Sequence, residues 1–115
     1  MDIEKELKEK TDQLTEERFR WLDALTKYQA AKEAVQLREA EITQELAAEV
    51  NGQGKPKFSN AETREAERII RQQKDEIHRV FVSERNDNWH AVKVAEIVVE
   101  RVQQSIANLR VVMSL

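Results

Sequence analysis

Both glycines and the only proline of this 115-residue chain lie within one stretch, residues 51–60. Glycine and proline are the residues that most often end a helix, so each flanking segment is free to form one uninterrupted helix. So few turn-forming residues cannot supply the many corners of an all-β sandwich or barrel. Charged residues make up 36% of the chain, a share typical of long helices and coiled coils. The sequence therefore predicts an all-α fold.

The turn-forming stretch divides the chain into two helical segments of similar length. We predict one helix over about 2–50, a loop over about 51–58 and a second helix over about 60–113, all within a single domain spanning 1–115. Ser59 and Glu62 have the spacing of a capping box, which predicts Ser59 as the N-cap of the second helix. The polar segment 83–88 is either a break in the second helix or a polar layer within it. Because that segment lacks glycine and proline, the continuous helix is favoured.

Apolar and aromatic residues recur every seven positions in the first segment, at Leu7, Leu14, Trp21, Tyr28, Val35 and Ile42. A heptad repeat places these side chains along one side of a helix, where Lys10, Glu17 and Arg38 interrupt the apolar pattern. Helices joined by a short loop pack antiparallel. The predicted fold is therefore a long antiparallel two-helix hairpin that resembles a coiled coil.

The length of the loop predicts how the two helices align. If residue 50 faces residue 60, the numbers of paired residues sum to about 110, as expected for an antiparallel pair. This alignment sets Trp21 opposite Trp89 and brings the large rings together. We prefer it to an alignment that differs by one heptad.

The C-terminal part of the second helix is more apolar than contact with one neighbouring helix requires. Its apolar residues cover roughly 160° of the helix surface, more than one partner helix buries. We therefore predict a homodimer of hairpins in a four-helix arrangement. In the alternative, the chain is a monomer in which residues 1–21 cover more of this face. The residues predicted to mediate self-association are Val92, Val98, Val99, Val102, Ile106, Leu109, Val112 and Met113.

The sequence offers no recognisable catalytic, metal or cofactor site. With no cysteine, disulfides, thiol catalysis and cysteine-ligated zinc are excluded. The loop 52–55 lacks the spacing of a P-loop. The pairs Asp75/His78 and Asp87/His90 are twelve residues apart, which turns them about 120° from each other on a helix and predicts solvated histidines. We expect a protein without enzymatic activity and without a cofactor.

Basic residues gather near the loop and along the start of the second helix. They are Lys55, Lys57, Arg64, Arg68, Arg71 and Arg79. A basic surface of this kind is a candidate contact for nucleic-acid phosphates. However, Arg71 has the helical spacing to pair with Glu67 and with Asp75, which favours a solvated, salt-bridged surface.

The sequence gives no sign of a membrane segment. No run of about 18 apolar residues occurs, and the start MDIEKELKEK is charged from its second residue, unlike a signal peptide. We expect no membrane contact and a cytoplasmic location.

The stretch GKPKFSNAETREAE, from Gly54 to Glu67, resembles a segment of small bacteriophage and prophage proteins. Those proteins carry a similar K-x-x-[FY]-S-N-x-x-x-R pattern after a turn. They also have an ending with arginine and leucine, which NLRVVMSL at 108–115 matches. The resemblance implies a phage-related helical hairpin but no activity and no site residues. Because some relatives accompany recombination genes, it also implies a link to nucleic-acid metabolism.

Taken with this resemblance, these patterns favour a non-enzymatic interaction or scaffold module that binds itself and a protein partner still to be identified. The first alternative is an accessory protein of recombination or replication that binds nucleic acid through the basic loop region. The second is a small inhibitor of a host or defence enzyme. It would act by surface mimicry through the acidic first helix, where residues 1–50 carry eight basic and thirteen acidic side chains.

Overall fold

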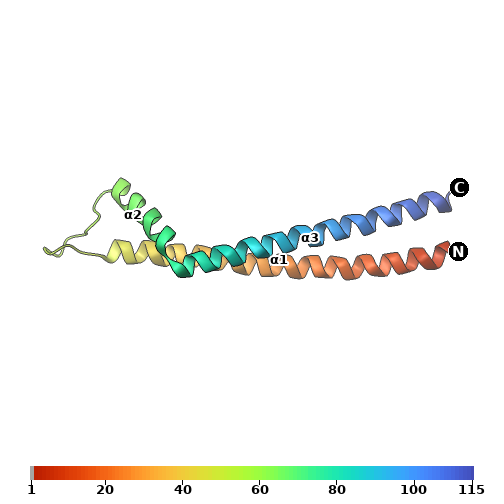
Figure 1. Cartoon of the computed structure of the whole chain (residues 1–115), viewed down its shortest axis with the longest axis horizontal. Helices are drawn as coiled ribbons and strands as arrows, with labels where there is room; N and C mark the ends of the chain where they lie inside the picture. Colours follow the sequence, from red (N-terminus) through yellow and green to blue (C-terminus); the bar gives the residue numbers. More distant parts are fainter. Residues whose placement is uncertain (1) are drawn as a thin grey trace. The chain divides into compact units, whose positions relative to one another are not determined.

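The computed structural model describes residues 2–115 as three α-helices: α1 (Ile3–Ala48), α2 (Ala61–Lys74) and α3 (Glu76–Met113) (Figure 1). No strand occurs within residues 2–115, where the only β-type pairing is an isolated bridge between Val50 and Pro56. The prediction of an all-α fold is confirmed. Across the same residues, no helix combines the length and apolar character needed to cross a bilayer.

The helices contribute to two compact units. The terminal unit comprises the residues up to Tyr28 together with Asp87–Leu115, and the loop unit comprises Gln29–Asn86. Helices α1 and α3 each begin in one unit and end in the other.

The connection between α1 and α2 is organised by Asn51. Its side-chain Oδ1 accepts hydrogen bonds from the backbone amides of Gln53 at 2.9 Å and Lys55 at 3.2 Å. Gly54 follows with a φ of +75°, a left-handed conformation that glycine adopts without strain. Helix α1 ends at Ala48, close to the predicted end near residue 50, and a tight polar turn follows it.

Helix α2 begins one residue later than the predicted capping box requires. Asn60, with an extended backbone, accepts a 2.7 Å hydrogen bond from the Thr63 amide through its side-chain Oδ1. Asn60 is therefore the N-cap, and the prediction of Ser59 is wrong. Asparagine and serine cap helices equally well, so spacing alone did not distinguish them.

The predicted second helix is broken, although not where a break was considered. The polar segment 83–88 lies inside α3 without interruption, whereas the helix over 60–113 stops at Asp75 and restarts at Glu76. The prediction of one continuous helix is therefore wrong. The contacts made at the break, some within residues 71–79 and some from α1, are described with the site below.

In the terminal unit, the first half of α1 runs antiparallel to the second half of α3 (Figure 1). Tyr28 contacts Trp89, whereas Glu6, earlier in α1, lines a groove with Leu109, later in α3. The core of this unit consists of four side chains of α3 that are at most 9% exposed: Val92, Val99, Val102 and Ile106.

These four buried residues belong to the face that was predicted to mediate self-association. They are buried within one chain, in the unit where the first half of α1 lies beside α3, and Trp21 of α1 lines a groove with Val99. The prediction of self-association assumed that one neighbouring helix cannot bury this face. For these four residues that assumption is wrong. The remaining four divide into Val98 and Leu109, half-buried, and Val112 and Met113, 49% and 46% exposed. Self-association itself stays a prediction.

The loop unit has a smaller core, supplied by α1. Val35, Ile42 and Leu46 are at most 3% exposed, and Val35 and Ile42 continue the predicted heptad repeat. Within residues 61–74, which form α2, no side chain is buried.

The alignment of α1 with α3 differs from the predicted one by one heptad. In the terminal unit the rings of Tyr28 and Trp89 lie 5.0 Å apart, and in the loop unit Glu39 faces His78 at 3.5 Å. Both pairs sum to 117 rather than about 110. The predicted pairing of Trp21 with Trp89 is therefore wrong. It assumed that α2 runs straight back along α1, whereas the chain turns at Asp75.

We expect Ile42→Ala to lower the free energy of unfolding by about 2–5 kcal/mol, because it opens a cavity at a side chain that is only 2% exposed. The matched control is Leu37→Ala, also in α1 but 63% exposed, which should change stability by about 0.5 kcal/mol or less. Urea denaturation followed by circular dichroism measures both. Equal effects would contradict the assigned core.

The alignment is open to a cross-linking test, since the chain has no cysteine of its own. We expect a short thiol cross-linker to join Tyr28→Cys with Trp89→Cys efficiently. Trp21→Cys with Trp89→Cys should react poorly, since seven residues displace position 21 by about 10 Å along the helix. Preferential reaction of the second pair would restore the alignment predicted from the sequence.

Candidate functional site

A single residue, Asp75, separates α2 from α3. Its backbone is extended, with φ −76° and ψ 116°, so the chain changes direction there (Figure 1). The Asp75 amide donates to the Arg71 carbonyl at 2.9 Å, as the last bond of α2. Its carboxylate Oδ2 accepts from the His78 amide at 2.7 Å and caps α3. Asp75 therefore ends one helix and begins the next; we call residues 71–79 the elbow.

Arg38 of α1 holds the elbow from outside. Its Nε and Nη2 donate to Oδ2 and Oδ1 of Asp75, each at 2.8 Å, in a two-pronged ion pair. The two side chains are 14% and 17% exposed, so water screens this pair less than a pair on the open surface. Arg38 is one of the residues that interrupt the apolar heptad pattern of α1, and the interruption is the site of a specific polar contact.

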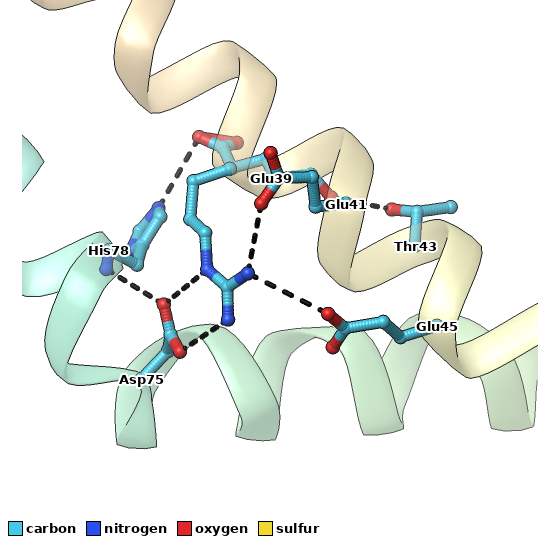
Figure 2. A network of polar contacts seen from close by, with 7 residues as sticks. Glu39, Glu41, Thr43, Glu45, Asp75 and His78 are labelled. Carbon is cyan, nitrogen blue, oxygen red and sulfur yellow. Dashed lines mark hydrogen bonds and ion pairs between the residues drawn. The ribbon is translucent and has the colours of Figure 1, made fainter.

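Two further carboxylates of α1, those of Glu41 and Glu45, lie near the Arg38 guanidinium; both are labelled in Figure 2. The Nη1 of Arg38 lies 3.0 Å from Glu41 Oε2 and 3.7 Å from Glu45 Oε1. Hydrogen bonds to Asp75, and then to Glu41, raise the pKa of Arg38. In return, the hydrogen bonds from Arg38 lower the pKa of Asp75 from 3.8 to about 2, and the His78 amide adds to the lowering. Asp75 is therefore ionised at every pH near neutrality.

His78 belongs to the same network. Its side chain is 15% exposed, and its Nε2 lies 3.5 Å from Glu39 Oε1. The two side chains point toward each other in Figure 2. The prediction that His78 points into solvent is wrong, because the break at Asp75 changes the direction of the helix that carries it. The predicted partnership of Arg71 with Asp75 is wrong for the same reason, since Arg38 occupies that carboxylate.

Arg71 instead joins the end of α1 to α2. Its guanidinium contacts Glu49 Oε2 at 2.5 Å and Glu67 Oε1 at 3.0 Å, so the predicted pairing with Glu67 is confirmed. The hydrogen bonds to Glu49 and Glu67 raise the pKa of Arg71, and the pKa of Glu49 is lowered in turn. The guanidinium also lies 5.7 Å from the ring centre of Phe58 in the loop.

All six basic residues considered for nucleic-acid contact lie in the loop unit, but several already have partners within the chain. Arg68 pairs with Glu65, and Arg71 is engaged as described. Arg79 donates through Nη2 to the Gln73 carbonyl at 3.2 Å. Lys57 lies 5.4 Å from the Phe58 ring centre, and Lys55 and Arg64 make no ion pair with a described residue. Of these six, Lys55, Lys57 and Arg64 are therefore the cations least engaged by other groups of the chain.

Apolar side chains remain exposed on both helices that meet at the elbow. Ile69 and Ile70 of α2 are 44% and 43% exposed, and Ile77 and Val80 of α3 are 51% and 53% exposed. Ile69 lines an open groove of about 330 Å³ with Gln72, His78 and three further residues of α2 and α3. We call Ile69, Ile70, Ile77 and Val80 the apolar rim.

The terminal unit has an open groove of its own, about 420 Å³ in volume, lined by Trp21, Leu22 and Val99 among others. The Trp21 indole Nε1 is buried there without a hydrogen-bond acceptor among residues 2–115. The heptad repeat predicted that the Trp21 ring packs against the other helix. It did not predict that the indole N–H would be buried without an acceptor from the described residues.

The chemistry of these sites is that of ion pairs and apolar contact. Over the described part of the chain, no group of three or more metal-ligating side chains comes together. At and beside the elbow, the guanidinium groups of Arg38 and Arg71 each pair with carboxylates, and such ion pairs hold neighbouring segments in place. Comparisons of the chain with family models, curated proteins and solved structures give no match. The resemblance to bacteriophage proteins therefore stays a prediction.

Two signals in the sequence could have revealed the elbow. Arg38 interrupts an apolar repeat and required a carboxylate partner from another segment. Asp75 is a weak helix former and a strong N-cap, followed by Glu76 in what would be a first turn. Neither signal identifies the other residue, so the pairing needs the three-dimensional structure.

The pKa of Asp75 gives the site a measurable pH dependence. Because that pKa is lowered from 3.8 to about 2, ionised Asp75 stabilises the folded state above the unfolded-state pKa and loses this contribution as the carboxylate is protonated. We expect the difference in urea midpoint between the native chain and Asp75→Asn to be constant above about pH 5 and to shrink between about pH 4 and 2. In an Arg38→Gln background, the same substitution should give a much flatter difference. An equally steep profile in that background would show that Arg38 does not lower the pKa.

Proposed function

We propose that this chain is a non-enzymatic protein–protein interaction module that docks through the apolar rim. The supporting observation is that α2, a 14-residue helix, has no buried side chain and presents two isoleucines more than 40% exposed. An isolated helix shorter than about 12–15 residues is marginal in water, and most helices in proteins are stabilised by burying an apolar face. A partner that covers the rim supplies that burial.

The occupant that we propose for the rim is a second copy of this chain. The four side chains of the rim are 43–53% exposed, and α2 has no buried side chain of its own. A second copy presents the same four apolar side chains, so a two-fold symmetric contact covers the rims of both copies at once. The sequence predicted self-association through apolar residues near the C-terminus, four of which are buried within one chain. We therefore propose the apolar rim as the surface that mediates self-association.

The nucleic-acid alternative has less support. Of the six predicted basic residues, only Lys55, Lys57 and Arg64 have no ion pair or hydrogen bond from the side chain within residues 2–115, and a specific interface with DNA usually involves several more phosphate contacts. No observation in the structure favours the inhibitor alternative over the interaction module.

Sedimentation equilibrium tests the proposal. We expect a dimer at micromolar concentration, which Ile69→Ser with Ile77→Ser weakens at least about 100-fold, because each copy loses two apolar contacts. The matched control is Phe19→Ser, which changes a side chain that is 68% exposed but lies in the terminal unit. Circular dichroism confirms that the helices persist. A monomeric native chain would contradict the second copy as occupant, and salt-dependent binding of labelled DNA that is lost on Arg64→Glu would favour the alternative.

A further inference from the structure

The break between α2 and α3 is confined to one residue. The hydrogen bond from the Asp75 amide to Arg71 and the bond from the Arg79 amide to the Asp75 carbonyl, at 2.9 and 3.1 Å, are those of an unbroken helix. Only the ψ angle of Asp75, 116°, departs clearly from the helical range. Rotation about one backbone bond therefore separates the bent chain from a straight helix.

The residues of the elbow do not themselves demand a break. The segment 71–79 contains neither glycine nor proline, so every position tolerates a helical backbone. Breaking a helix also leaves amides and carbonyls without their usual partners. Within the elbow only Asp75, a weak helix former and a strong N-cap, favours a break locally, so contacts from outside the elbow contribute to holding the bend.

Side chains replace the backbone partners that the bend removes. The Asp75 carboxylate accepts from the His78 amide at 2.7 Å, and the Arg79 guanidinium donates to the Gln73 carbonyl at 3.2 Å. Both contacts are local to the elbow. The tie to α1 at Asp75 itself is the two-pronged bond from Arg38, which holds the carboxylate in its capping position.

Arg38 also has partners if Asp75 leaves. Glu41 and Glu45, on the same helix, lie 3.0 and 3.7 Å from its Nη1. Release of Asp75 therefore does not leave a guanidinium without a counter-charge, which would otherwise oppose any movement. The carboxylate of Asp75, already 17% exposed, gains water in exchange.

We infer that the elbow is a two-state hinge with Arg38 as its latch. In the latched state Asp75 is bound to Arg38 and the chain bends between α2 and α3. In the released state Arg38 pairs with Glu41 and Glu45, Asp75 becomes helical, and residues 61–113 form one helix. The hinge depends on contacts within one chain and is independent of self-association. The apolar rim has two residues before Asp75 and two after it. The two states therefore differ in how these pairs of side chains are oriented relative to each other.

Distances between paired spin labels distinguish the two states. Glu62→Cys and Ser83→Cys place labels at exposed positions of α2 and α3 in a chain without native cysteine. In a straight helix, 21 residues separate the labelled backbone positions by about 32 Å, and the bend shortens that distance by several Å. Labelled chain is diluted in excess unlabelled chain, so that only distances within one chain are detected. We expect the shorter distance in the native background and a shift to the longer one in Arg38→Met.

Glu41→Gln is the matched control, since it removes a partner of Arg38 but leaves the bond to Asp75, and it should keep the shorter distance. Asp75→Ala is a second variant that removes the carboxylate and introduces the strongest helix former. It should also give the longer distance, with helix content undiminished in circular dichroism. The latch is refuted if folded Arg38→Met keeps the shorter distance, whatever Asp75→Ala does, because Asp75→Ala also removes the cap on the His78 amide. The hinge is refuted if Asp75→Ala keeps the shorter distance too, or if both variants lose helix instead of straightening. If Arg38→Met fails to fold, Arg38→Gln takes its place in the same measurement.

Discussion

Burial of an apolar stripe between two antiparallel helices holds each unit of this chain together. The stripe is narrow: seven side chains are essentially covered, three from α1 in the loop unit and four from α3 in the terminal unit. A helix buries one side chain about every 3.6 residues on a given face, so one helix pair gains stability only in proportion to its length. The long heptad repeat of α1 is thus a requirement of the architecture, since within residues 2–115 no third layer of structure adds to the core of either unit.

Polar residues within such a stripe are costly unless each finds a partner, and the chain uses this requirement to define its geometry. Arg38 occupies a position where the repeat calls for an apolar side chain. Its guanidinium is matched to Asp75 on a different segment, which fixes where α2 ends and how α3 starts. Arg71 performs a similar task near the loop by joining Glu49 to α2. Apolar contacts therefore stabilise the packing of the helices, whereas the ion pairs of Arg38 and Arg71 specify how the segments of the loop unit are arranged.

Features that depend on local chemistry were predictable from the sequence. The all-α class, the turn between 51 and 60 and the end of α1 follow from where glycine and proline occur, and the core residues Val35 and Ile42 follow from the heptad repeat. Features that depend on contacts between distant segments were not. At the break, Asp75 is bound by Arg38, 37 residues earlier, and the alignment of the helices differs from the predicted one because the chain turns there. The burial of Val92, Val99, Val102 and Ile106 within one chain likewise depends on packing beside α1, which a helical wheel does not represent.

The lack of any buried side chain in α2 has a consequence for how the chain loses its structure. Protection of backbone amides from hydrogen exchange follows the free energy of local opening, which is small where little apolar surface is exposed by opening. Residues 61–74 are held by a cap at Asn60 and by ion pairs, whereas α1 and α3 must part from each other to open. The segment from the loop to Asp75 is therefore the part that opens first, before the paired stretches of α1 and α3. A protease that needs an unfolded stretch would cut there and leave the paired helices intact.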